Sequence, residues 1–221
     1  MNAVGTTKIL ESEIQEIKHL TDSTFIIRME RKHMKFTAGQ YIRVGFPDNI
    51  EMREYSIYSS EHDNFIEILV KEIIGGEISK KLKKCKPGDK LLVDGPFGFF
   101  DIEKKNRVKK LLFIASGTGI APFHSFVKTY PNLDYILLHG VANGEEAYRK
   151  EEYDPSKYKL CTTKDNAGDF KGRVTDFLIN HKLDTSMLVY LCGNSNMIYD
   201  SFEILESKGF SREQLFTEAY F

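Results

Sequence analysis

The feature that most constrains the fold is a change of pattern near residue 105. Before it, short segments rich in Ile, Val, Tyr and Phe are separated by Gly, Pro, Asn and Asp, which is typical of an antiparallel β-barrel or sandwich. The predicted strands cover residues 24–30, 41–46, 53–59, 65–71 and 90–96. One predicted helix, residues 76–85, interrupts them.

After residue 105, apolar strands alternate with helical segments, which predicts a parallel, doubly wound sheet. A nearly continuous apolar strand at 108–115 leads into a Gly-rich turn and a helix over 121–130. Further segments follow at 135–141, 144–153 (helical and charged), 159–163, 173–181, 187–193, 196–208 (helical) and 214–221. We therefore expect an α+β chain of two domains: an antiparallel β-barrel over 1–105 and an α/β doubly wound parallel sheet over 106–221.

Composition excludes several classes of protein. The 221 residues suit one large or two small domains, and 41% hydrophobic with 29% charged residues is an ordinary globular balance. No stretch approaches the roughly 20 apolar residues of a membrane helix, and no secretory signal opens the chain. Cys85, Cys161 and Cys192 form no C-x-x-C pair, and the six histidines show no metal-ligand spacing. We expect no metal site, a cytoplasmic location and a monomer.

Charge is unevenly distributed along the chain. Residues 71–110 carry 12 Lys/Arg and 6 Asp/Glu inside a protein of net charge −1. The sequence pI of 6.6 argues against nucleic-acid binding. The basic block is either a solvated face or a patch that meets an acidic partner.

The clearest motif of the second domain is G-T-G-I-A-P, Gly117 to Pro122, between a buried strand and a helix. Glycines there let backbone approach a pyrophosphate, and a helix N-terminus offers N–H groups and positive dipole. Pro122 suits the first helical turn. The pattern is neither G-x-G-x-x-G nor a P-loop, and a plain tight turn remains the alternative.

Three other motifs are weak when taken singly. In the strand segment R-E-Y-S, Arg53 and Tyr55 share a face and offer a phosphate-binding guanidinium and a flat ring, while Ser56 faces the other way. Gly76 to Ser79 opens the first domain's helix, as an anion site or a plain cap. Cys192-Gly193-Asn194 ends a buried strand, where α/β folds place ligands, although a buried cysteine is usually just a small apolar residue.

Taken together, these motifs make the chain resemble the ferredoxin/flavodoxin–NADP reductase family over essentially its full length. The matching segments are R-E-Y-S (53–56), G-E-I-S (76–79), G-P-F-G (95–98), G-T-G-I-A-P (117–122), C-G-N (192–194) and E-A-Y-F (218–221). The resemblance implies a flavin-binding barrel followed by a nicotinamide-cofactor domain, with FAD and NADP(H) as cofactors.

The resemblance also implies roles on the flavin side. Arg53 would bind the flavin pyrophosphate, Tyr55 would lie against the isoalloxazine or the ribityl chain, and Ser56 would hydrogen-bond near flavin N5. Tyr220 would stack on the opposite flavin face, and Phe221 would cover the flavin or its adenine. The residues expected to cradle the flavin phosphates are Gly76, Glu77, Ile78 and Ser79.

On the nicotinamide side, Cys192, beside Gly193, would pack near nicotinamide C4 without acting as a nucleophile, and Glu218 would support charge or proton changes there. The expected pyrophosphate cradle is Gly117, Thr118, Gly119 and Pro122. Thr163, Lys164 and Arg173 resemble the family's 2′-phosphate region, and Phe170 is a candidate adenine platform. The cations and hydroxyl of this region favour NADP over NAD, although Thr-Lys in place of the family's usual Ser-Arg leaves one bidentate donor fewer.

The implied function is electron transfer between NADP(H) and an acidic ferredoxin or flavodoxin, which would dock on the basic 71–110 region. Alternatives within the enzyme class are an NAD-linked reductase component of an oxygenase and a free-flavin reductase. A non-catalytic nucleotide- or protein-binding module is the alternative from another class.

Overall fold

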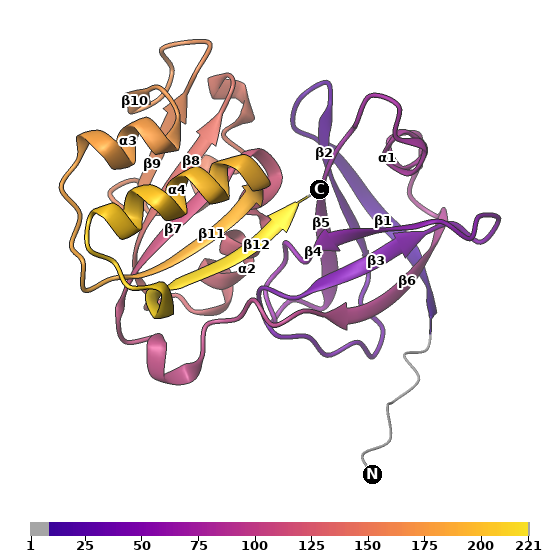
Figure 1. Cartoon of the computed structure of the whole chain (residues 1–221). Helices are drawn as coiled ribbons and strands as arrows, with labels where there is room; N and C mark the ends of the chain where they lie inside the picture. Colours follow the sequence, from indigo (N-terminus) through magenta and orange to yellow (C-terminus); the bar gives the residue numbers. More distant parts are fainter. Residues whose placement is uncertain (1–8, 221) are drawn as a thin grey trace. The chain divides into compact units, whose positions relative to one another are not determined.

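The computed structural model describes residues 9–220 (Figure 1). The chain forms two compact units that divide between Asp101 and Ile102. We call residues up to 101 the barrel unit and residues from 102 on the α/β unit. No helix among the described residues is long and apolar enough to cross a membrane.

The barrel unit is a closed antiparallel sheet of six strands in the order β4-β3-β6-β1-β2-β5. The strands are β1 (Leu10–His19), β2 (Thr24–Glu30), β3 (Tyr41–Gly45), β4 (Met52–Ser56), β5 (Phe65–Lys71) and β6 (Lys90–Phe97). An antiparallel bridge between Ile57 and Ile68 joins the outer strands, and the Tyr58 N–H donates to the Glu67 carbonyl at 2.7 Å. Closure in this way removes the exposed sheet edges.

The sequence patterns did not predict β1. Its LESEIQEIKH segment buries only Ser12 and Ile14, and six of its other side chains are exposed. The strand exists because β2 and β6 pair with its two edges. A mostly polar strand therefore forms here through neighbouring strands rather than through its own apolar periodicity.

The core of the barrel unit is filled by inward-facing aliphatic and aromatic side chains from its strands. The short helix α1 (Glu77–Leu82) adds Ile78 and Leu82 to this core. The predicted helix over 76–85 is thus confirmed in a shorter form. Its apolar residues fix the turn that begins at Gly76 against the barrel.

The α/β unit is a parallel sheet in the order β10-β9-β8-β7-β11-β12. Its strands are β7 (Lys110–Ser116), β8 (Asp134–Val141), β9 (Tyr158–Thr162), β10 (Phe170–Lys171), β11 (Leu188–Asn194) and β12 (Leu215–Tyr220). From β7 the chain builds outward through β8 to β10, then returns to place β11 on the other side of β7. The strand order therefore reverses between β7 and β11, and such a switch point is where doubly wound folds bind ligands.

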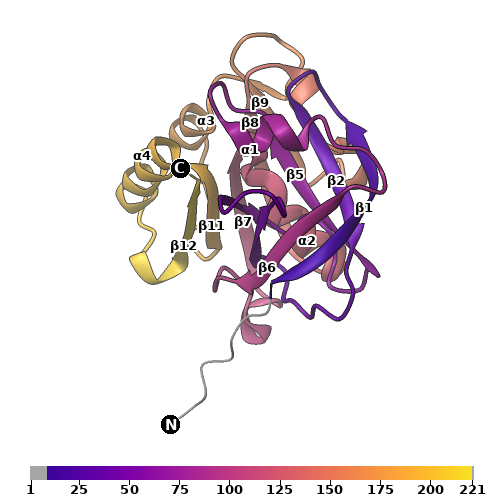
Figure 2. The same ribbon diagram turned by 90° about the vertical axis from the view of Figure 1, so that its right-hand side faces the viewer.

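Helices cover both faces of this sheet, as Figure 2 shows with α3 and α4 on one side and α2 on the other. The helices are α2 (Ala121–Thr129), α3 (Val174–Asn180) and α4 (Ser195–Ser207). Leu112 and Ile114 of β7 belong to the core with α3 and α4. Phe113, between them, stacks on Phe123 of α2 at a centroid distance of 4.8 Å. The continuous apolar run of β7 thus reflects burial on both faces.

The predicted helix over 144–153 is wrong. This segment forms two 3₁₀ turns, Gly144–Glu146 and Lys150–Glu152, with Arg149 in the left-handed region at φ 50°. Tyr148 and Tyr153 are both buried. Their burial, five positions apart, draws the chain against the sheet instead of leaving an amphipathic helix on the surface.

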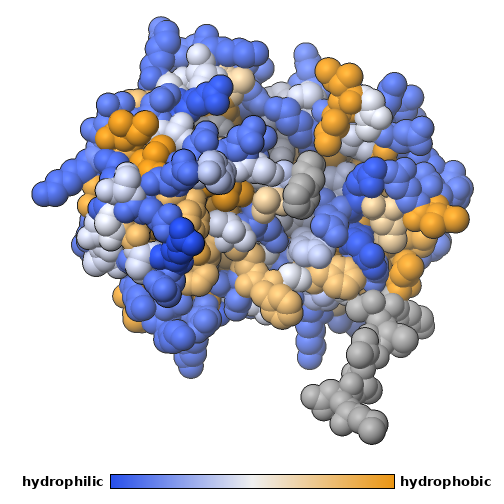
Figure 3. All heavy atoms as spheres, in the orientation of Figure 1, coloured by the Kyte–Doolittle hydropathy of each residue, from blue (hydrophilic) through white to orange (hydrophobic). Residues whose placement is uncertain are grey.

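The face of the molecule in Figure 3 is mostly hydrophilic, with separate hydrophobic areas. Fully exposed apolar side chains include Ile50, Ile74 and Phe99. Singly exposed apolar residues are ordinary on protein surfaces, so they indicate no interface by themselves.

Candidate active site

Strand β4 carries Arg53, Tyr55 and Ser56. Arg53 is exposed and forms an ion pair with Glu51 two residues earlier. Tyr55 is half-buried against the barrel core, and this burial raises the pKa of its hydroxyl to about 12 although Arg53 works in the opposite direction. Ser56 is buried at the end of the strand. The predicted alternation therefore leaves a guanidinium and part of one ring face accessible.

The turn that begins α1 is held by side-chain and backbone contacts to the preceding segment. The Ser79 hydroxyl accepts a hydrogen bond from the Ile73 N–H at 3.1 Å, and the Gly76 N–H donates to the Ile73 carbonyl at 2.9 Å. Gly76 provides no side chain to cap the first turn of the helix. The first backbone N–H groups of a helix have no partner within the helix, which is the feature on which the predicted anion site depends.

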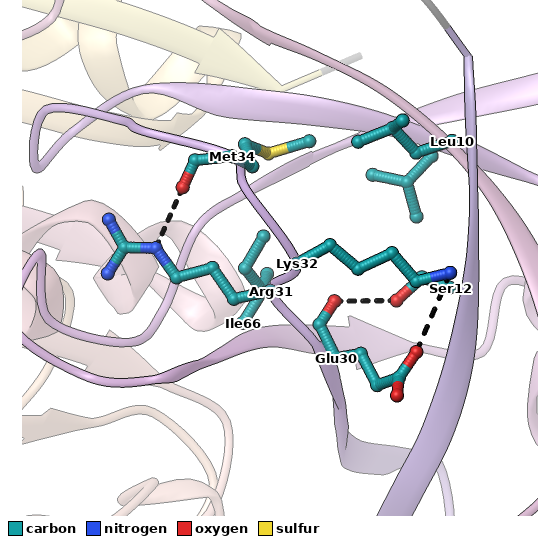
Figure 4. Close-up of a pocket in the computed structure, with 8 residues that line it drawn as sticks. Leu10, Ser12, Glu30, Arg31, Lys32, Met34 and Ile66 are labelled. Atoms are coloured by element: carbon teal, nitrogen blue, oxygen red, sulfur yellow. Dashed lines mark hydrogen bonds and ion pairs between the residues drawn. The ribbon is translucent and has the colours of Figure 1, made fainter.

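A small hollow in the barrel unit, drawn in Figure 4, is structural. The Arg31 Nε donates to the Met34 carbonyl at 2.8 Å, and the Ser12 hydroxyl donates to the Glu30 carbonyl at 2.6 Å. Lys32 pairs with the Glu30 carboxylate at 3.6 Å. These polar groups satisfy one another, so they fix the turn after β2.

In the α/β unit, Gly117 to Pro122 lies at the switch point, directly after β7. The segment forms a 3₁₀ turn, Gly117–Ile120, that runs into α2, and Pro122 falls in the first turn of that helix as predicted. Gly117 has φ +55°, and nothing lies within 4 Å of where a Cβ would stand. The turn is therefore open on the side that Gly117 presents.

This turn interlocks with the end of β11. A Cβ on Gly119 would overlap the Cys192 carbonyl oxygen and lie 2.6 Å from the Gly193 Cα. A Cβ on Gly193, at φ +131°, would lie 2.8 Å from the Ser116 carbonyl oxygen. The Ser116 hydroxyl also accepts from the Asn194 N–H at 2.9 Å. Glycine is required on both sides because two backbones pass in direct contact.

Cys192, Glu218 and Tyr220 lie together, because β11 and β12 run in parallel with Cys192 beside Glu218 and Asn194 beside Tyr220. Cys192 is fully buried, and this burial, followed by the nearby Glu218 carboxylate, raises the pKa of its thiol well above the usual range. A hydrogen bond with Tyr220 has the opposite, smaller effect. The thiol is therefore protonated at neutral pH. Phe221 lies outside the described residues.

At the far side of the sheet, Thr163 and Lys164 follow β9 as an exposed turn. Their N–H groups donate to the Val141 and Ala142 carbonyls at 3.2 and 2.8 Å. Arg173 is exposed before α3. The half-buried Phe170 ring meets Phe177 edge-on at 5.4 Å.

Sequence reasoning missed His139, which lies on β8 beside Ala115 of β7. It is fully buried, and its Nε2 lies 2.9 Å from the Gly117 carbonyl oxygen. A single histidine in an apolar strand carries no sequence signal for such a contact. Among residues 9–220, no group of three or more His, Cys, Asp or Glu is placed to hold a metal ion.

Comparison with known proteins agrees with this arrangement. Residues 10–102 match the oxidoreductase FAD-binding domain, and residues 113–202 match the oxidoreductase NAD-binding domain. A ferredoxin NADP⁺ reductase from Neisseria gonorrhoeae, solved with bound FAD and NADP, superposes with a TM-score of 0.89 at 27% identity, over 97% of this chain and 99% of that one.

The chain is an oxidoreductase of the two-domain type to which the ferredoxin/flavodoxin–NADP reductases belong. It is an oxidoreductase with an FAD-binding and a nicotinamide-cofactor-binding domain. A flavodoxin/ferredoxin–NADP reductase of Buchnera aphidicola is 26% identical over 89% of this chain and 90% of its own length. The toluate 1,2-dioxygenase electron transfer component of Pseudomonas putida is 25% identical over 95% of this chain and 67% of its own length.

The residues of this reductase-family chain fit its cofactors. In the α/β unit, the open backbone at Gly117 and the start of α2 suit a pyrophosphate. In the barrel unit, the exposed Arg53 guanidinium suits a second phosphate, and the half-exposed Tyr55 ring suits a flat aromatic group.

Proposed function

We propose that this protein transfers electrons between NADP(H) and a one-electron carrier protein of the ferredoxin or flavodoxin type. FAD supplies the chemistry when bound, since it exchanges a hydride with nicotinamide and single electrons with a carrier. The observation that carries the proposal is the interlocked Gly119–Gly193 backbone at the switch point, in a chain that matches a ferredoxin NADP⁺ reductase over 97% of its residues.

In the α/β unit, the Gly117–Pro122 turn binds the nicotinamide cofactor's pyrophosphate through backbone N–H groups. Cys192 stays a thiol and packs at the nicotinamide rather than attacking it, which agrees with its raised pKa. Glu218, half-buried beside it, holds charge or a proton at the reacting end. Tyr220, on the same strand, would offer its ring for stacking on the flavin.

In the barrel unit, Arg53 binds the flavin pyrophosphate. Its guanidinium must then leave the Glu51 carboxylate or bind the carboxylate and the phosphate together. Tyr55 supports the flavin from the barrel side, and Ser56 lies near flavin N5. Gly76 to Ser79 adds backbone donors for the phosphates. Arg53→Ala should therefore lower FAD retention without unfolding the barrel.

Coenzyme choice rests on the exposed turn after β9. Lys164 and Arg173 supply cations and Thr163 a hydroxyl for the 2′-phosphate, with Phe170 beside the adenine. Lys164→Glu should raise the KM for NADPH and leave that for NADH unchanged. A wild-type preference for NADH would overturn this assignment.

For the carrier, we propose docking on the basic residues at the end of α1 and directly after it. Lys81 forms an ion pair with Asp48 at 2.6 Å, and Lys83 forms one with Glu72 at 2.6 Å. Acids of the barrel unit therefore partly neutralise these two lysines. Lys80 and Lys84 are exposed, and no described acid lies within ion-pair distance of either. Charge reversal at Lys80 and Lys84 should slow reduction of an acidic carrier most at low salt. Unchanged rates would overturn the docking site.

The decisive experiment is a visible spectrum of the purified protein, followed by anaerobic titration with NADPH. A flavin band that bleaches stoichiometrically supports the proposal. A colourless protein that shows no flavin band after incubation with FAD would overturn it and favour a non-catalytic binding module.

A second candidate is the reductase component of an oxygenase, because the Pseudomonas electron transfer component covers 95% of this chain. Steady-state rates with NADPH and NADH, each against ferredoxin, flavodoxin and free flavin, separate the candidates. Preference for NADH with a ferredoxin favours the oxygenase reductase, and preference for free flavin favours a flavin reductase.

A further inference from the structure

A buried histidine and a buried tyrosine stand behind the Gly117 turn. His139 of β8 places Nε2 2.9 Å from the Gly117 carbonyl oxygen. Its Nδ1 lies 2.7 Å from the Tyr158 hydroxyl of β9. Both side chains are almost completely buried. A chain of two hydrogen bonds therefore runs from β9 through β8 to the residue that follows β7.

The chemistry of these groups permits one arrangement of protons. A carbonyl oxygen only accepts, so the Nε2 of His139 carries a proton and donates it to Gly117. In neutral imidazole the other nitrogen then accepts, so the Tyr158 hydroxyl donates to Nδ1. Burial lowers the pKa of His139 to about 4 and raises that of Tyr158, so both remain neutral at physiological pH.

The groups facing His139 do not disturb this assignment. The Tyr148 ring lies 5.8 Å from the imidazole, and its hydroxyl donates to the Glu146 carboxylate at 3.2 Å. Glu146 favours a charged imidazole, but burial is the larger effect on the pKa of His139. The Glu146 carboxylate also accepts a hydrogen bond from the Asn143 N–H at 3.3 Å, so its oxygens bond to Asn143 and Tyr148.

The contact sets the direction of one peptide plane. In a trans peptide, C=O and N–H point in opposite directions. Because the Gly117 carbonyl points to His139, the Thr118 N–H points away from it. Gly117 is the residue with left-handed φ and open space at its Cβ position. With no Cβ, Gly117 leaves this peptide freer to rotate than another residue would, so the hydrogen bond from His139 adds a restraint to those of the 3₁₀ turn.

We propose that His139 is a positioning residue, which, held in one tautomer by Tyr158, orients the Gly117–Thr118 peptide so that its N–H faces the pyrophosphate of the nicotinamide cofactor. The inference rests on the proposed function, because it presumes that the turn binds a dinucleotide. It adds a neutral hydrogen-bonded relay, reaching across three strands, to the glycines of the turn itself.

The test compares two ligands on the flavin-loaded full-length protein by calorimetric titration. NADP⁺ has the pyrophosphate, whereas adenosine 2′-monophosphate lacks it. His139→Leu should raise the Kd for NADP⁺ about tenfold, since it removes the imidazole donor to the Gly117 carbonyl, and should change the Kd for adenosine 2′-monophosphate less than about twofold. His139→Gln, which keeps an N–H donor, should recover part of the loss.

Tyr158→Phe should raise the Kd for NADP⁺ about threefold, because His139 loses the hydroxyl that selects its tautomer. The matched control is Tyr148→Phe, which removes a buried hydroxyl beside His139 but leaves both hydrogen bonds of the relay in place. It should change neither Kd. Equal weakening of both ligands, or none, in His139→Leu would overturn the inference and leave the proposed function standing. A wild type that binds neither ligand would overturn both.

Imidazole ¹⁵N NMR of the wild type gives a readout that survives if His139→Leu fails to fold. It should show His139 neutral and protonated at Nε2 from pH 5.5 to 8. The Nδ1–H tautomer, or a charged ring at pH 7, would overturn the relay.

Discussion

The turn at Gly76 in the barrel unit and the turn at Gly117 in the α/β unit look alike in sequence, since each places glycine before a helix. They are built differently. A Cβ on Gly76 would lie 3.0 Å from the Ser79 hydroxyl, which is a side chain. A Cβ on Gly119 would overlap the backbone of Cys192. A side chain can rotate away from an added atom, whereas a turn packed against a strand backbone cannot, so the α/β turn tolerates far less change.

Gly119→Ala should produce the largest effect. The added Cβ forces the Gly117–Ile120 turn away from the end of β11 at the switch point, so we expect a loss of roughly 3 kcal/mol in unfolding free energy. Chemical denaturation measures it, and nicotinamide nucleotide binding should disappear with it. A variant that binds NADP⁺ normally would show that the interlock is looser than the backbone contact implies.

Acid should weaken the α/β unit before the barrel unit. The pKa of His139 is about 4 when folded, whereas the usual value is 6.5. The unfolded chain therefore binds more protons between these values, and stability is lost as pH falls from 6.5 toward 4, by at most about 1.4 kcal/mol per pH unit. Amide exchange in β7 and β8 should speed up relative to β2 over this range. His139→Gln should remove this difference in exchange between the two units. If the difference persists in that variant, other titrating groups cause it.

Gly117→Ala should have a smaller effect on stability, about 1 kcal/mol, because the φ of +55° is costly for alanine but the space is open. Its matched control is Gly88→Ala in the barrel unit, where φ is +95° and nothing lies within 4 Å. Both variants should lose stability in denaturation curves. Only Gly117→Ala should also weaken NADP⁺ binding. Equal affinity of the two variants for NADP⁺ would contradict a role of the Gly117–Pro122 turn in binding.

Gly76→Ala should have the smallest effect, below about 1 kcal/mol, because its φ of −79° suits any residue and the nearest neighbour is a hydroxyl. FAD retention, measured by flavin fluorescence after dialysis, should fall only slightly. Complete loss of FAD would show that the two turns are equally intolerant.

Local sequence patterns predicted the secondary structure correctly where the burial of side chains follows their periodicity. The apolar run of β7 and the switch to alternating strands and helices predicted the parallel sheet, and the structure confirms both. Patterns failed where neighbours decide: β1 is a polar strand held by β2 and β6, and residues 144–153 form 3₁₀ turns because Tyr148 and Tyr153 are buried. Local propensity includes neither the pairing of a strand with its neighbours nor the burial of a side chain against a distant segment.

The sequence by itself determined the division into a barrel and an α/β unit, the family, and the motifs that we propose bind the cofactors, because these depend on residue types in local order. Only the tertiary structure decided which glycines are indispensable and that His139 holds the Gly117 carbonyl. Residues 117 and 139 are joined by the pairing of β7 with β8, and Gly119 meets Cys192 through the reversal of strand order. Contacts between distant segments exist only once the sheet has formed, so no local pattern in the chain encodes them.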